Sequence, residues 1–259
     1  MSTDSKMKVT FLGTGTSTGV PVIACNCDVC RSDDPRDRRY RTSAMLTVGN
    51  TNVVIDCGPD FRNQMLKNKI ENIDAVIFTH AHRDHIAGLD DIRAFNYILN
   101  KVVNIYGTHE TLESIKTQFP YIFFSGRYFG IPQITLNTIG DEPFTISGIE
   151  FQPIKIMHQD LPITGYRVGN FTYITDANHI DAGELEKVRG SKVIVLNALR
   201  NSRHVSHFSL SEALEILEDL KPERAYLTHI SHFLGKQEDV EKKLPPYVRL
   251  AYDNLVIEV

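Results

Sequence analysis

The stretch Thr79-His80-Ala81-His82-Arg83-Asp84-His85 places three imidazoles and one carboxylate within six positions. It directly follows residues 75–78, an apolar run typical of a strand buried on both faces. Sites in open α/β sheets form at such strand ends. Imidazole nitrogen and carboxylate oxygen are accepted ligands of divalent ions such as zinc. The stretch therefore predicts a metal site, with His80 and His82 directed at one ion and Asp84 and His85 able to reach a second.

Strand-like segments dominate the rest of the chain, and helical patterns are interspersed among them. Strands are predicted at 9–12, 44–48, 52–55, 75–78, 102–106, 131–136, 149–156, 164–168, 171–175, 193–196, 225–227 and 255–259. Helices are predicted at 60–67, 89–99 and 209–220, where Ser209 and Glu212 form a capping box. Residues 120–132, rich in Tyr, Phe and Gly, are expected to form an ordered insertion. Without an evident linker or repeat, the sequence predicts one α/β domain over residues 1–259.

Composition limits the class of protein. Hydrophobic residues make up 42% and charged residues 23%, which is ordinary for a globular domain, and the net charge is −4. A slightly acidic chain has no global basic field, which makes nucleic acid an unlikely partner. No apolar run is long enough for a membrane span, and residues 1–10 lack the apolar core of a signal peptide. We therefore expect a cytoplasmic protein that does not contact a membrane.

Three of the four cysteines, Cys25, Cys27 and Cys30, fall within six residues. In a chain without export signals, such spacing favours a metal site over disulfides. A tetrahedral structural zinc needs four ligands, and His232 is a candidate for the fourth. Cys57 stands apart and is expected in the core.

These motifs resemble the metallo-β-lactamase superfamily over nearly the whole chain. The resemblance includes Phe11-Leu12-Gly13-Thr14-Gly15, Asp56-Cys57-Gly58 and the loop of residues 80–85. It implies an αββα sandwich, in which two mixed sheets are flanked by helices and two catalytic divalent ions, zinc or manganese, lie at one edge.

The resemblance also implies roles for single residues that follow predicted strands. His158 matches the third ligand of the first ion, Asp176 the bridging carboxylate, and His229 the last ligand of the second ion. Asp56 matches a buried acid that braces the metal loop, and such carboxylates orient ligand histidines.

Together with Thr228-His229-Ile230-Ser231-His232, the cysteine trio is similar to the phosphoribosyl 1,2-cyclic phosphate phosphodiesterase group within that superfamily. This similarity implies that the trio and His232 hold one structural zinc, and that the chain forms a homodimer. It also implies a metal-dependent hydrolase with a small phosphodiester substrate, a cyclic diester of a ribose phosphate that is opened by attack of a metal-held hydroxide.

The leaving oxygen of such a reaction needs a proton. His207 is the candidate donor because it lies just ahead of the capped helix at Ser209, and a histidine in an equivalent segment is the acid in the resembling enzymes. His204, three residues earlier, is its rival. The basic run that contains Arg36, Arg38, Arg39 and Arg41 is interpreted as a solvated loop rather than as a phosphate guide.

Three alternatives remain open at this stage. A tRNA 3′-end endonuclease shares the Gly- and Thr-rich start and the metal loop, although the chain lacks a long basic arm for gripping tRNA. Thioester or lactone hydrolysis could use the same metal pair. A metal-carrying protein of cofactor assembly would perform no turnover and would need no proton donor.

Overall fold

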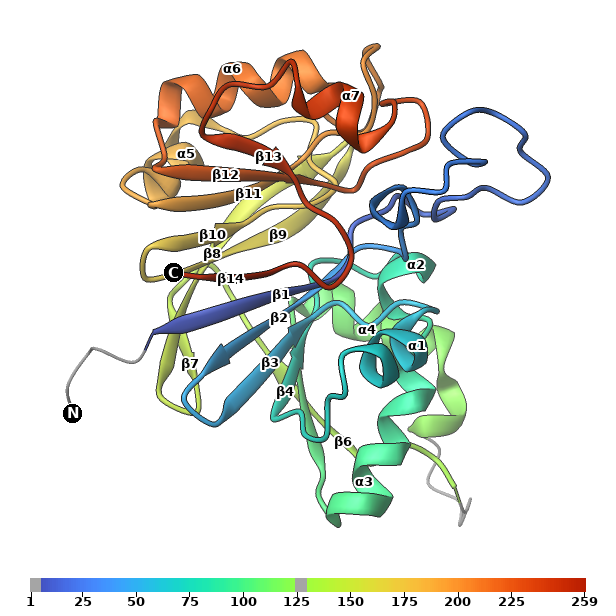
Figure 1. Ribbon diagram of the computed structural model, residues 1–259. Helices are drawn as coiled ribbons and strands as arrows, with labels where there is room; N and C mark the ends of the chain where they lie inside the picture. The colour runs from blue at the N-terminus through green and yellow to red at the C-terminus, as the bar shows by residue number, and fades with distance from the viewer. Residues whose placement is uncertain (1–5, 124–129) are drawn as a thin grey trace.

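Two seven-stranded sheets pack against each other in the computed structural model, which describes residues 6–123 and 130–259 (Figure 1). In order across the first sheet lie β14 (Val256–Glu258), β1 (Met7–Gly13), β2 (Ser43–Val48), β3 (Thr51–Ile55), β4 (Ala75–Ile77), β5 (Val103–Gly107) and β6 (Ile134–Thr138). The second sheet contains β13 (Val248–Leu250), β12 (Arg224–Thr228), β11 (Val193–Asn197), β10 (Phe171–Tyr173), β9 (Leu161–Val168), β8 (Ile149–His158) and β7 (Phe144–Ile146).

Each sheet is mixed in the same way. Strands β3 to β6 are parallel, whereas β14, β1, β2 and β3 pair antiparallel. In the second sheet β10 to β13 are parallel, and β7 to β10 pair antiparallel. The prediction of two mixed sheets is therefore confirmed.

Helices cover the outer face of each sheet (Figure 1). Against the outer face of the first sheet, at the right of the view, lie α1 (Phe61–Lys67), α2 (Arg83–Ile86), α3 (Arg93–Leu99) and α4 (His109–Gln118). Above the second lie α5 (Ala182–Val188), α6 (Leu210–Leu220) and α7 (Gln237–Glu241). Short 3₁₀ turns occur at Pro35–Asp37, Leu89–Ile92 and Pro120–Ile122. This arrangement confirms the predicted αββα sandwich.

The core has three layers because each sheet buries both of its faces. Between the sheets, Phe11 and Ile55 of the first meet Tyr173 and Val195 of the second, and all four are fully buried. Outside the second sheet, Leu217 of the capped helix α6 packs on strands β11 and β12. Continuous apolar strands such as β11 follow from burial on both faces.

Some elements differ from the prediction. Residues 89–99 form a 3₁₀ turn followed by the short helix α3 rather than one helix. The helix α4 was not predicted, because its sequence is mostly polar and buries only Thr111, Leu112 and Ile115. The capping box at Ser209 is confirmed. Of the expected insertion at 120–132, residues 124–129 lie outside the described residues.

The interpretation of the arginine run as a solvated loop is wrong for Arg39. Its side chain is buried, and it donates to the Thr14 hydroxyl, the Ala251 carbonyl and the Gln237 side chain. A buried guanidinium needs such partners, because an unpaired charge in the interior is costly. Arg39 therefore joins the early loop to two segments near the C-terminus.

No helix among the described residues is long and apolar enough to cross a membrane.

The strand ends matter most for function. Asp56 follows β3, His158 ends β8 and His229 follows β12. These ends meet on one side of the sandwich.

Candidate metal centre

The side chains predicted to bind the catalytic ions converge in the structure. They do so although the first of them, His80, and the last, His229, are 149 positions apart in the sequence. Three groups have ligand atoms that all lie within 4.8 Å of one another. They are His80, His85 and Asp176; His158, Asp176 and His207; and Asp84, Asp176 and His229. Asp176 belongs to all three, which places its carboxylate at the middle of the cluster.

Hydrogen bonds determine which nitrogen of two rings is free. His85 Nδ1 lies 2.7 Å from Asp56 Oδ2, an acceptor, so Nδ1 carries the hydrogen. His158 Nδ1 lies 2.8 Å from the carbonyls of both Asp176 and Ser206, so it is also a donor. In a neutral imidazole the other nitrogen then has a lone pair. Nε2 of each ring is thus available as a ligand.

The same reasoning applies to His80 through a threonine. The Thr79 hydroxyl donates to Asp56 Oδ2 at 2.8 Å and lies 3.0 Å from His80 Nδ1. Because its single proton is used by Asp56, the hydroxyl accepts from His80 Nδ1–H. Nε2 of His80 is therefore unprotonated. Sequence reasoning missed Thr79, although its position directly before His80 offered a signal.

A divalent ion fits this cluster. Nε2 of His80 and Nε2 of His85 are buried without a hydrogen-bond partner among the described residues. A buried polar atom without a partner is costly, and an ion would supply the missing interaction. The lone pairs are accompanied by the carboxylates of Asp84 and Asp176, and this mixture of imidazole nitrogen and carboxylate oxygen suits zinc or manganese.

The electrostatics of the cluster also favour a cation. Burial opposes charge on the His85 ring, but the carboxylates of Asp176, Asp84 and Asp56 raise its pKa well above its ordinary value. Burial likewise opposes the charge of Asp176, yet His229 and His85 hold its pKa well below the ordinary value. Surroundings that hold a proton on His85 would also attract a divalent ion in its place.

Two of the predicted ligands, His82 and His229, differ from the others in their contacts. The His82 ring lies 4.6 Å from that of His80 and 5.1 Å from that of His158 between centroids, but His82 belongs to none of the three groups. His229 Nδ1 lies 3.1 Å from Asp176 Oδ2, and its Nε2 lies 3.2 Å from the hydroxyl of Thr16. Thr16 also escaped the sequence reasoning, because nothing local links it to residue 229.

The two candidate proton donors lie on one loop. His207 Nδ1 is 3.8 Å from Asp176 Oδ1, and its ring lies 4.7 Å from that of His158. The centroids of the His204 and His207 rings are 5.2 Å apart. Burial, followed by the effect of His229, lowers the pKa of His207 to about 3. A bound phosphate would oppose this shift, because an adjacent negative charge favours the protonated ring.

A second cluster lies beside the first. The sulfur atoms of Cys25, Cys27 and Cys30 are 3.3, 3.4 and 3.5 Å from His232 Nδ1. The backbone N–H of Cys30 lowers the pKa of Cys27 to about 6, so its thiolate is available at neutral pH. Three sulfurs and one imidazole nitrogen match a tetrahedral zinc site. Cys57 is fully buried, as expected.

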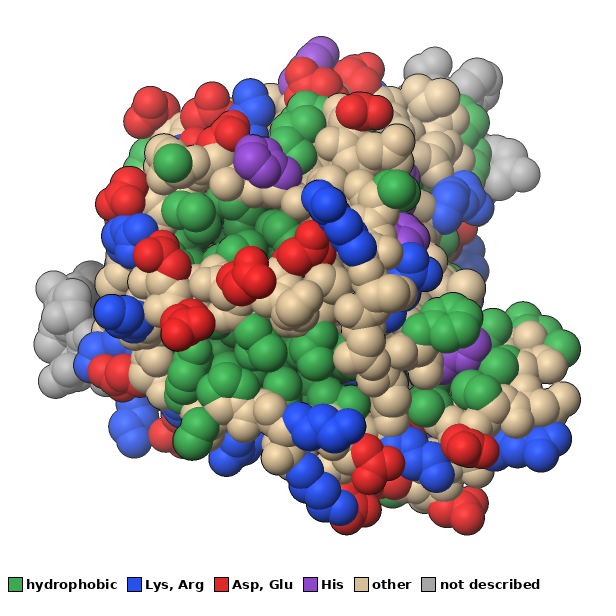
Figure 2. All heavy atoms as spheres, turned by 90° about the horizontal axis from the view of Figure 1, so that it is seen from above, with side chains coloured by type: hydrophobic (Ala, Val, Ile, Leu, Met, Phe, Trp, Pro, Cys, Tyr) green, Lys and Arg blue, Asp and Glu red, His purple; other side chains and the backbone are tan. Residues whose placement is uncertain are grey.

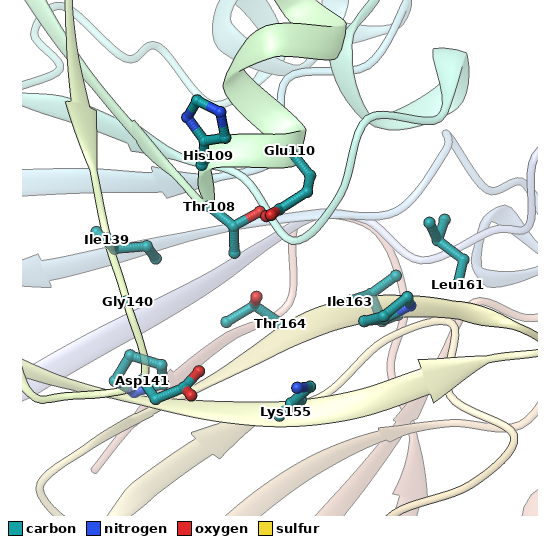
Figure 3. Close-up of a pocket in the computed structure, with 12 residues that line it drawn as sticks. Thr108, His109, Glu110, Ile139, Gly140, Asp141, Lys155, Leu161, Ile163 and Thr164 are labelled. Carbon is teal, nitrogen blue, oxygen red and sulfur yellow. The ribbon is translucent and has the colours of Figure 1, made fainter.

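Two cavities of similar volume differ in their relation to the cluster. One of about 450 Å³, shown in Figure 3, is bounded by Thr108 and His109 at the start of α4 and by residues 161–164 of β9. None of the predicted metal ligands lines it. The other, of about 460 Å³, is lined by His207 and His204 and therefore adjoins the metal centre.

Comparison with known proteins identifies the family. Residues 51–230 match the model of the β-lactamase superfamily domain. A solved structure described as a new diphosphatase from the PhnP family is 39% identical, with a TM-score of 0.91 and 98% coverage of both chains. The chain belongs to the β-lactamase superfamily and, within it, to the PhnP family. The resemblance inferred from the motifs is thereby confirmed.

Other relatives are more distant or only partly covered. An octanoyltransferase of Porphyromonas gingivalis is 36% identical over 96% of this chain, but the match covers 51% of that protein. The chain thus spans about half the length of this curated relative. Zinc-bound PqqB from Methylobacterium extorquens is 17% identical, with a TM-score of 0.79 and coverage of 97% and 100%, and shows the shared fold alone. The family and the clustered ligands together support a metal-dependent hydrolase.

The role of Thr79 is testable by substitution. Thr79→Val removes the acceptor of His80 Nδ1–H, so we expect metal affinity to fall by about 10–100-fold. Titration with Co²⁺, followed by the visible absorption of the bound ion, measures this affinity. Thr79→Ser keeps the hydroxyl and should bind like the parent. An unchanged titration and spectrum for the valine variant would show that the hydroxyl does not orient His80.

Proposed function

We propose that the chain is a phosphodiesterase that uses two divalent ions, and that its substrate is a small phosphodiester. The observation that carries the proposal is the Asp176 carboxylate, which belongs to three groups of ligand atoms. One of these groups contains His80 and His85, whose Nε2 atoms have no hydrogen-bond partner among the described residues. One shared carboxylate between two sets of ligands is the arrangement expected for paired ions.

The ligands divide into two proposed sets. His80, His82 and His158 would hold the first ion, and Asp84, His85 and His229 the second, with Asp176 shared. When bound, the ions would make water a stronger acid and polarise a phosphoryl oxygen. Asp56 and Thr79 keep His80 and His85 in the ligand tautomer. His207, whose ring lies against both His158 and His229, would give a proton to the leaving oxygen.

The substrate class rests on three considerations. The 39% identical PhnP-family protein is described as a diphosphatase, which supports cleavage at phosphorus. The resemblance of the motifs to the phosphoribosyl 1,2-cyclic phosphate phosphodiesterase group supports a cyclic diester of a ribose phosphate. Figure 2 shows acidic side chains interspersed with basic ones on one face, an arrangement that does not favour a polynucleotide. A homodimer and a cytoplasmic location stay predictions.

The first test combines metal analysis with a substrate panel. We expect the metal-loaded protein to hydrolyse bis(p-nitrophenyl) phosphate and a ribose cyclic phosphate, and Asp176→Ala to abolish turnover. A dinucleoside diphosphate, a precursor tRNA and a thioester test the alternative substrates. Asp181→Ala, which changes an exposed acid that pairs with His179, is the control and should keep the parent rate.

Full turnover by a metal-replete Asp176→Ala variant would refute the assignment of that carboxylate. A protein that binds its metals but hydrolyses none of the panel would instead favour a metal-carrying role.

His207 is tested by the choice of leaving group. A general acid contributes about 10²–10⁴-fold, and mainly where the leaving oxygen is a poor one. His207→Ala should therefore slow hydrolysis of an alkyl ester strongly and that of a p-nitrophenyl ester only slightly. His179→Ala, at an exposed histidine, is the control. If His204→Ala shows the selective loss instead, His204 is the donor.

The cysteine cluster is proposed to hold one structural zinc. Cys27→Ala should lower the metal content by one ion per chain and also lower Tm, because structural zinc contributes directly to folding energy. Elemental analysis and a thermal melt measure both effects. Cys57→Ala removes a buried thiol outside the cluster and should keep the metal content. An unchanged metal count in Cys27→Ala would contradict the zinc assignment.

A further inference from the structure

The cavity of about 450 Å³ shown in Figure 3 is lined by none of the predicted metal ligands and has no part in the proposed reaction. Its walls come from both sheets. Residues 108–110 follow β5 and residues 139–141 follow β6, whereas the opposite wall belongs to β8 and β9. Sites for small molecules have volumes of about 300–1,000 Å³, so the cavity is large enough to hold a ligand of its own.

Five of the lining residues are apolar. They are Ile139, Pro153, Leu161, Pro162 and Ile163. The two isoleucines are buried, whereas the Leu161 side chain is 40% exposed. A ligand with an apolar part would remove this leucine surface from water, which favours binding. The cavity therefore suits a molecule that is apolar over part of its surface.

Two opposite charges lie on one side of the cavity, those of Asp141 and Lys155 (Figure 3). Asp141 lies in the segment after β6, and Lys155 lies in β8. Neither side chain forms an ion pair with the other or with another described residue, so the two charged groups are more than 4.0 Å apart. Both residues are exposed. The space between a free carboxylate and a free ammonium group is thus open to a ligand.

The other charged groups of the lining lie across the cavity, at the start of α4. They are His109 and Glu110 (Figure 3). A hydrogen bond from its own backbone N–H is the main cause that lowers the pKa of Glu110, so this carboxylate already has a partner. Asp141 is therefore the acid that remains available to a ligand.

This distribution of charge selects among ligand classes. Two carboxylates and one ammonium group line the cavity, and repulsion by the carboxylates disfavours a nucleotide or another polyanion. A ligand with a single charge would leave either Asp141 or Lys155 without a counter-charge. A small zwitterion can pair with both at once, and its remaining surface can be apolar.

We propose that this cavity binds an aliphatic α-amino acid. Its ammonium group would lie against Asp141 and its carboxylate against Lys155, both as charge-assisted hydrogen bonds. Its side chain would pack on Leu161, Ile139 and Ile163. The proposal does not rest on the phosphodiesterase assignment, because no predicted metal ligand or proton donor belongs to the cavity.

Binding of an amino acid and its analogues tests the proposal. Isothermal titration calorimetry on the metal-loaded protein would compare L-leucine with leucinamide, which lacks the carboxylate, and with 4-methylpentanoate, which lacks the ammonium group. We expect leucine to bind, and each analogue to bind at least about tenfold more weakly, as the loss of a charge-assisted contact implies. The amino acid glycine keeps both charges but has no apolar side chain, so it should also bind more weakly.

Substitution of the two charged residues locates the site. Asp141→Asn and Lys155→Gln should each weaken leucine binding by about tenfold. Both side chains are exposed, so the fold should stay intact, which circular dichroism verifies. The matched controls are Glu142→Gln, at the next residue along the chain, and Lys8→Gln, at an exposed lysine of β1. Neither residue lines the cavity, and both variants should bind leucine like the parent.

Three outcomes would overturn the proposal. Leucine can chelate a metal ion through its amino and carboxylate groups, and binding that is unchanged in both Asp141→Asn and Lys155→Gln would place it at the metal centre instead. Equal binding of leucine and the two analogues would show that the paired charges are not recognised. No binding of leucine, with or without binding of adenosine 5′-monophosphate, would exclude the amino acid as the ligand.

Discussion

The buried carboxylate of Asp56 determines how the metal centre is organised. Its oxygens accept from the backbone N–H of Thr79, the Thr79 hydroxyl and His85 Nδ1. Through these bonds one side chain sets the tautomer of His85 directly and that of His80 by way of Thr79. Asp56 is fully buried, so water could not replace a lost bond. The lone pairs that make the cluster a metal site therefore depend on an acid that would not itself touch the ion.

The two sheets supply the geometry that this carboxylate requires. Asp56, Asp176 and His229 all follow strands, with φ angles of 61°, 61° and 55°. Non-glycine residues with such angles are destabilised by about 1–3 kcal/mol and persist where the surroundings determine them. Here the buried last residues of β3 and β12, Ile55 and Thr228, hold the chain on the strand side of two of these turns. The apolar core thus stabilises backbone conformations that direct the ligands toward one another.

Much of the fold and the metal loop could be predicted because their signals are local, whereas His158, Asp176 and His229 could be predicted only from the resemblance to a known family. Apolar runs gave the buried strands, and the closely spaced histidines gave the metal loop. Features that depend on distant partners could not be predicted. From the sequence, the Arg39 side chain is expected to be solvated, because its partners Ala251 and Gln237 are distant in the sequence. The role of Thr79 required the position of Asp56, and that of Thr16 required the position of His229.

The proposed zinc cluster and the candidate metal centre are connected through the segment between His229 and His232. Ile230 N donates to the Thr14 carbonyl at 2.9 Å, and Thr16 N donates to the Ile230 carbonyl at 3.1 Å. Thr14 is bonded in turn by the buried Arg39. A shift of His232 must therefore move His229 or break bonds that water cannot easily replace. An ion held by Cys25, Cys27, Cys30 and His232 would act on catalysis by fixing the position of His229, without contact with substrate.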